Sequence, residues 1–149
     1  VSGFGTLFQV EERTREALVA CTSKSDWYGA LAELERGGGM HTVDAGDSIH
    51  FWRHLLEDCP GPLNRLFSGE FSTLSYLDTS GDPNLFFSGA ALVEQAAIDF
   101  GKLTGATLRR MFPDQPEHML LPLDGSLRSL QAFVASAAAS GRAIVGLWH

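Results

Sequence analysis

The sequence predicts an α+β fold, with several helices packed on a small mixed sheet in one compact domain spanning residues 1–149. Two patterns favour this class. Helical periodicity covers most of the chain, and the few strand-like segments do not alternate regularly with the helices, as they would in a doubly wound sheet. The composition agrees, because 44% apolar and 19% charged residues are typical of a globular domain.

The N-terminal part of the chain predicts one strand followed by two helices. Residues 4–10 are rich in β-forming side chains, and residues 11–21 predict a short helix. Ser25 is the expected N-cap of the second helix, and Asp26 suits the positive end of its dipole. Three glycines at 37–39 end that helix, because glycine is costly in a helical backbone.

A third helix is expected over residues 48–57, with Asp47 as its N-cap and the sequence Pro-Gly-Pro at 60–62 as its end. Residues 69–81 fit either a strand or a surface loop, and residues 85–87 predict a short strand. The apolar residues of the helix share one face and are expected to be buried: Ile49, Trp52, Leu55, Leu56 and Cys59.

The C-terminal part predicts further helices and a last strand. Ser88 is the expected N-cap of one helix, which breaks near Thr104 before a shorter segment. The clearest helix covers residues 127–140, with Ser126 as its expected N-cap and a glycine just after its end. Residues 143–148 are apolar on both faces, which predicts a strand in the middle of the sheet.

Charge and composition exclude several classes of function. With 18 acidic and 11 basic residues the net charge is −7, which argues against binding to nucleic acid. No apolar run reaches the roughly 18 residues that a membrane helix needs, so no membrane partner is expected. Two cysteines cannot form a disulfide framework and suit a reducing compartment, which predicts a cytoplasmic location. No phosphate-binding loop or nucleophile elbow is found, so we assign no catalytic residue and expect no cofactor.

The densest polar cluster lies around the predicted third helix. Asp47, His50 and His54 fall at i, i+3 and i+7, on one helical face, with His41 and Asp44 just upstream. Two histidines four residues apart can share a metal ion, and a nearby carboxylate can complete the site. The alternative is a solvated polar face. We favour it because the chain lacks the glutamate of a His-Glu-x-x-His motif, and we therefore predict no bound metal.

Two further residues of the same helix are candidates for binding. Trp52 could line a cleft, although an aromatic at helical spacing is more often part of the core. Arg53 could hold an anion, although an isolated arginine is more often a surface charge. The candidate binding residues are therefore Asp47, His50, Trp52, Arg53 and His54.

The order of segments resembles the YfbM-like family, small bacterial α+β domains catalogued as a domain of unknown function. The likeness covers nearly the whole chain and includes the helix Asp47-Ser48-Ile49-His50-Phe51-Trp52-Arg53-His54. The family helix reads Asp-Lys-x-Trp with a histidine four residues later. Asp47 and His54 occupy matching places here, whereas Ser48 and His50 replace the lysine and the tryptophan. The resemblance implies a bacterial, cytoplasmic setting without an established activity, and related domains include immunity-like members of toxin systems.

Two functions from different classes follow. The first is a protein-binding module, of which an immunity-type inhibitor is one form, because a charge of −7 attracts a basic partner over long range. The second is a small metal-dependent hydrolase that uses the Asp47, His50 and His54 face. Binding is the favoured interpretation. The sequence leaves the partner and the oligomeric state open.

Overall fold

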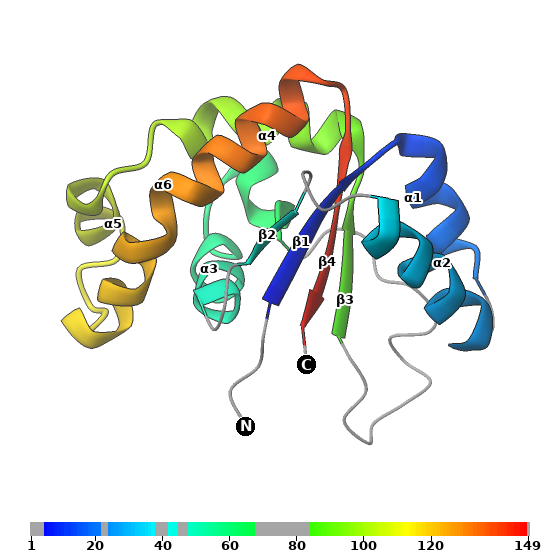
Figure 1. Ribbon diagram of the computed structural model, residues 1–149. Coiled ribbons are helices and arrows are strands. Elements are labelled where there is room, and N and C mark those ends of the chain that lie inside the picture. Colours follow the sequence, from blue (N-terminus) through cyan, green and yellow to red (C-terminus); the bar gives the residue numbers. More distant parts are fainter. Residues whose placement is uncertain (1–4, 22–23, 38–41, 45–47, 68–83, 149) are drawn as a thin grey trace.

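A computed structural model describes residues 5–21, 24–37, 42–44, 48–67 and 84–148 (Figure 1). The segment 69–81 and the predicted cap Asp47 lie outside the described residues. The elements follow in the order β1 (Gly5–Val10), α1 (Glu12–Val19), α2 (Lys24–Gly37), β2 (Thr42–Asp44), α3 (Ser48–Leu56), the 3-10 helix η2 (Gly61–Arg65), β3 (Asn84–Ser88), α4 (Ala90–Gly101), α5 (Gly105–Met111), α6 (Glu117–Ala139) and β4 (Ala143–Trp148).

The four described strands form one sheet in the order β2-β1-β4-β3. All three pairings are antiparallel, so the α+β class is confirmed, but the sheet is not mixed as expected. Strand β4 lies between β1 and β3, which confirms the central position predicted from its apolar residues. None of the helices in the described segments combines the length and apolarity required to cross a bilayer.

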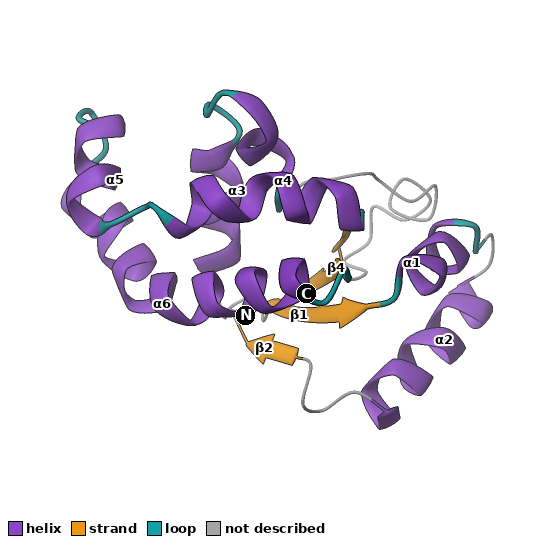
Figure 2. Cartoon of the chain, turned by 90° about the horizontal axis from the view of Figure 1, so that it is seen from above, coloured by secondary structure: helices purple, strands orange, loops and turns teal. Residues whose placement is uncertain are grey.

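Helices cover both faces of the sheet, which gives three layers (Figures 1 and 2). The side chains of a strand alternate between faces, so neighbours on β1 point to opposite layers. Leu7 packs with residues of α3, α4 and α6, whereas Phe8 packs with Leu18 of α1. Strands β3 and β4 divide in the same way, with Phe86 on the first side and Phe87 on the second.

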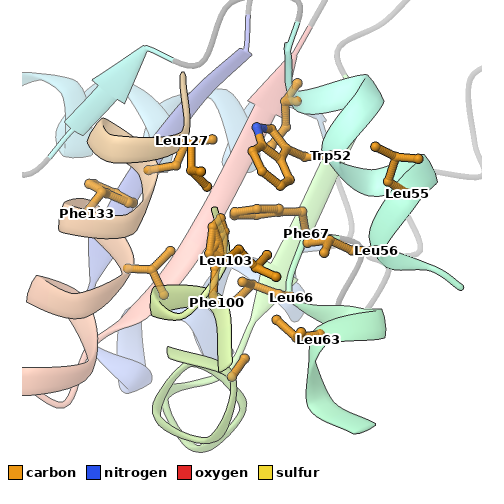
Figure 3. Close-up of a cluster of buried hydrophobic side chains, with 14 of the residues drawn as sticks. Trp52, Leu55, Leu56, Leu63, Leu66, Phe67, Phe100, Leu103, Leu127 and Phe133 are labelled. Carbon is orange, nitrogen blue, oxygen red and sulfur yellow. The ribbon is translucent and has the colours of Figure 1, made fainter. Parts of the chain in front are cut away.

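The main core lies between the sheet and helices α3, α4 and α6 (Figure 3). Four fully buried aromatic rings run through it. The ring centroids of Trp52 and Phe100 are 5.4 Å apart, and Phe67 meets Phe100 edge to face at the same distance. Phe67 also lies edge to face with Phe86 of β3 at 6.1 Å. Such pairs each add about 0.5–1.5 kcal/mol beyond the burial of their surface.

A glycine of the central strand makes room for one of these rings. Gly146 is the register partner of Phe86 across the β3–β4 pair. A Cβ atom at this position would lie only 1.9 Å from the Phe86 ring. The ring therefore lies directly over the Gly146 backbone, and a larger residue would push it into a filled core.

The helix starts differ from two of the predicted caps. Helix α2 begins at Lys24, so Ser25 lies inside the first turn rather than at the cap. Ser88 ends strand β3 and its hydroxyl donates to the Leu66 carbonyl at 2.6 Å, so the cap of α4 is Gly89. The predicted break near Thr104 is confirmed, because α4 ends at Gly101 and Thr104 caps the shorter helix α5 by accepting from the Thr107 amide.

The longest helix, α6, begins ten residues earlier than predicted. It runs from Glu117 through Pro122, so Ser126 lies mid-helix and does not cap it. Proline disfavours a helix interior because it cannot donate the i→i−4 bond, but its fixed φ has a helical value, and α6 continues through Pro122. The C-terminus is as expected: Gly141 has φ of +64°, and the Arg142 amide donates to the Ala137 carbonyl.

Candidate functional site

The predicted polar face of α3 is described only in part. His54 is exposed near the end of this helix, which suits either an accessible ligand or a solvated side chain. Asp47 and His41 lie outside the described residues, and the side chain of His50 is not described. Among the side chains that the structure does describe, no three metal-ligating groups gather at one point. The Asp47, His50 and His54 site therefore stays a prediction.

Trp52 belongs to the core rather than to a cleft. Its side chain is fully buried and its ring packs on Phe100. The indole Nε1 donates to the Ser126 hydroxyl of α6 at 2.9 Å, which satisfies the one polar atom of the ring. The tryptophan thus fixes α3 against α6. Figure 3 shows the ring above Phe67 and Phe100, inside the layer of helices.

Arg53 is half-buried on α3. Burial lowers the pKa of its guanidinium, and the nearby Glu57 carboxylate opposes that shift. Arginine nevertheless stays charged at any physiological pH, because its ordinary pKa is far above that range. Arg53 therefore brings a permanent positive charge to the edge of the main core, beside an exposed histidine of the same helix.

A charged cluster joins α5 to the start of α6. The Arg109 guanidinium donates through Nε to both carboxylate oxygens of Glu117, each at 3.1 Å. It also contacts both oxygens of Asp124, at 2.7 and 3.2 Å. These two carboxylates raise the pKa of Arg109. A Cβ atom at Gly105 would lie 2.8 Å from Asp124, so glycine permits this close approach. Arg109 therefore holds two carboxylates in fixed positions.

An exposed apolar side chain lies between those carboxylates on the helix. Glu117, Leu121 and Asp124 occur at i, i+4 and i+7, which places them on one face. Leu121 is 56% exposed, and Met111 of the neighbouring α5 is 38% exposed. We call Glu117, Leu121 and Asp124 the α6 acidic face. The sequence contains this i, i+4, i+7 spacing, but the helix that it predicted began only at residue 127, after these three residues.

A cavity of about 300 Å³ lies beside the start of α4. Arg15 of α1 and Arg65 of η2 line it together with Glu12, Gln95, Phe87 and Leu92. The Glu12 carboxylate accepts from the Arg15 guanidinium at 2.6 and 2.9 Å and from the Ala90 amide at 2.9 Å. The hydrogen bond from Arg15 is the main reason why the pKa of Glu12 is lowered. No local motif could reveal this cavity, because its residues come from four separate elements.

The described elements form a three-layer α+β protein with an antiparallel sheet. Its architecture is similar to the crystal structure of YfbM from Escherichia coli, a protein of unknown function, with a TM-score of 0.64 and 13% sequence identity. The match covers 98% of this chain and 99% of that one. The chain therefore has a YfbM-like fold, as the order of its segments predicted. No protein-family profile and no curated protein matches the sequence.

Proposed function

We propose that this chain is a single-domain cytoplasmic module that binds a basic protein partner, with an immunity-type inhibitor as one form of that role. The α6 acidic face is the observation that carries the proposal. It presents the exposed Leu121 between two carboxylates that Arg109 already holds in place. Fixed carboxylates lose little freedom when a partner binds, and an apolar side chain among them adds surface to bury.

The position of this face and the charge of the chain support the same function. Figure 1 shows α5 and the first turns of α6 at the edge of the molecule, away from the sheet. A partner can therefore approach without displacing another of the described elements. The net charge of −7 attracts a basic partner over long range, while the short-range contacts of the α6 acidic face determine how well the partner fits.

A photo-crosslinking amino acid at position 121 tests the proposal in cells that carry the native chain. We expect one discrete protein adduct, which the added change Glu117→Lys greatly reduces. The same crosslinker at Ala135, an exposed position farther along α6, is the matched control and should not give that adduct. Equal adducts from both positions, or an adduct that the charge reversal leaves unchanged, would contradict binding through this face.

A further inference from the structure

The cavity beside α4 differs from the rest of the molecule in charge. Two arginines and one glutamate line it, so its described charged groups sum to +1, in a chain whose net charge is −7. Arg15 is only 8% exposed, and its guanidinium donates to the Glu12 carboxylate, which fixes its direction. A cationic pocket in an acidic protein favours an anion over the cations that the surface attracts.

Two polar side chains at this cavity, Arg65 and Gln95, are available to a bound molecule as far as the described residues go. Within the described part of the chain, the side chain of Arg65 makes no hydrogen bond or ion pair, and the side-chain amide of Gln95 makes no hydrogen bond. Both side chains belong to exposed residues, so they can reorient toward a molecule in the cavity. A guanidinium offers a fork of N–H donors that matches the two oxygens of a carboxylate.

The remaining wall is apolar. Phe87 is fully buried and Leu92 is half-buried, and both contribute to the lining. Pockets of about 300 Å³ stand at the lower limit for small-molecule sites, which excludes large cofactors. We propose that this cavity binds a small monocarboxylic acid, with its carboxylate on Arg65 and its short apolar chain against Phe87 and Leu92. This site is separate from the α6 acidic face and does not depend on the proposed partner.

Titration with sodium butyrate, followed by backbone amide NMR and calorimetry at constant ionic strength, tests the proposal. We expect saturable binding, with shifts centred on Gly89 and Gln95. The change Arg65→Gln should weaken it about tenfold, the loss of roughly 1.4 kcal/mol. Arg36→Gln removes the same charge from an exposed position on α2 and should leave the affinity unchanged.

Two related probes separate the parts of the proposal. Inorganic phosphate carries charge without an apolar chain, and butanol carries the chain without charge, so both should bind more weakly than butyrate. The proposal is overturned if butyrate gives no saturable shifts, if phosphate binds as tightly, or if Arg36→Gln has the same effect as Arg65→Gln. Unfolding curves of both variants check that each is folded.

Discussion

Among the described residues, the two faces of the sheet pack against different sets of side chains. On one side, α3, α4 and α6 bury a continuous set of aromatic and leucine side chains around Trp52 and Phe100. On the other side, the described contacts are fewer and centre on Leu18 and Phe87, and a groove of about 520 Å³ runs beside Leu18. Among the described residues, the same central strand therefore supports a large continuous core on one face and a smaller cluster beside a groove on the other.

The layers also differ in the interactions that stabilise them. The thicker layer depends on shape, because buried rings meet one another and the backbone of Gly146. Helix α1 of the opposite layer is instead linked to the start of α4 by a carboxylate, since Glu12 binds both Arg15 and the Ala90 amide. A charged link is sensitive to pH and salt, whereas apolar packing is not.

The largest effect is expected from Leu130→Ala in the thicker layer. Leu130 is fully buried in the main core, so its truncation leaves a space among packed side chains. We expect a loss of about 3–5 kcal/mol, the upper part of the range for such truncations. Urea unfolding of both proteins measures it. A loss below about 1 kcal/mol would mean that α6 does not pack on the sheet as described.

Leu18→Ala is the matched change in the thinner layer. Leu18 is as buried as Leu130, with 1% exposure, but it borders the groove between α1 and α2. Water and mobile neighbours can fill part of the space, so we expect about 2 kcal/mol, the lower limit for this substitution. The same unfolding experiment compares the two. Equal losses would show that both faces are packed equally tightly.

The charged link predicts a pH-dependent difference for Glu12→Gln. Because the pKa of Glu12 is lowered in the folded protein, its contribution is complete above the ordinary value of 4.5 and is lost as the pH falls through the folded value. We expect the variant to be less stable by about 0.5–1 kcal/mol at neutral pH, a modest figure because the carboxylate is 38% exposed. The difference should vanish in acid. A constant difference across pH would assign the loss to packing.

The sequence predicted local structure better than it predicted sites. Most elements follow from apolar spacing, and Gly141 and the central strand β4 behave as expected. Helix α6 shows why a boundary was missed: the helix starts at Glu117 and continues through Pro122, although proline usually disfavours a helix interior. The cavity beside α4 could not be predicted at all. Arg15, Arg65 and Gln95 meet only because of tertiary packing, which no local pattern encodes.

The smallest effect is expected on the outer face of α3, where the two interpretations of the histidines differ. If His50 and His54 form a solvated face, the double change to alanine should alter stability by less than about 1 kcal/mol, as is usual for surface positions. Imidazole is well solvated in water, and Asp47, His50 and His54 supply at most three ligands from one helix. We therefore expect the purified protein to contain no stoichiometric transition metal. Metal analysis that returns one zinc per chain, lost in the double variant, would instead favour a metal-dependent hydrolase and place the chemistry on the thicker layer.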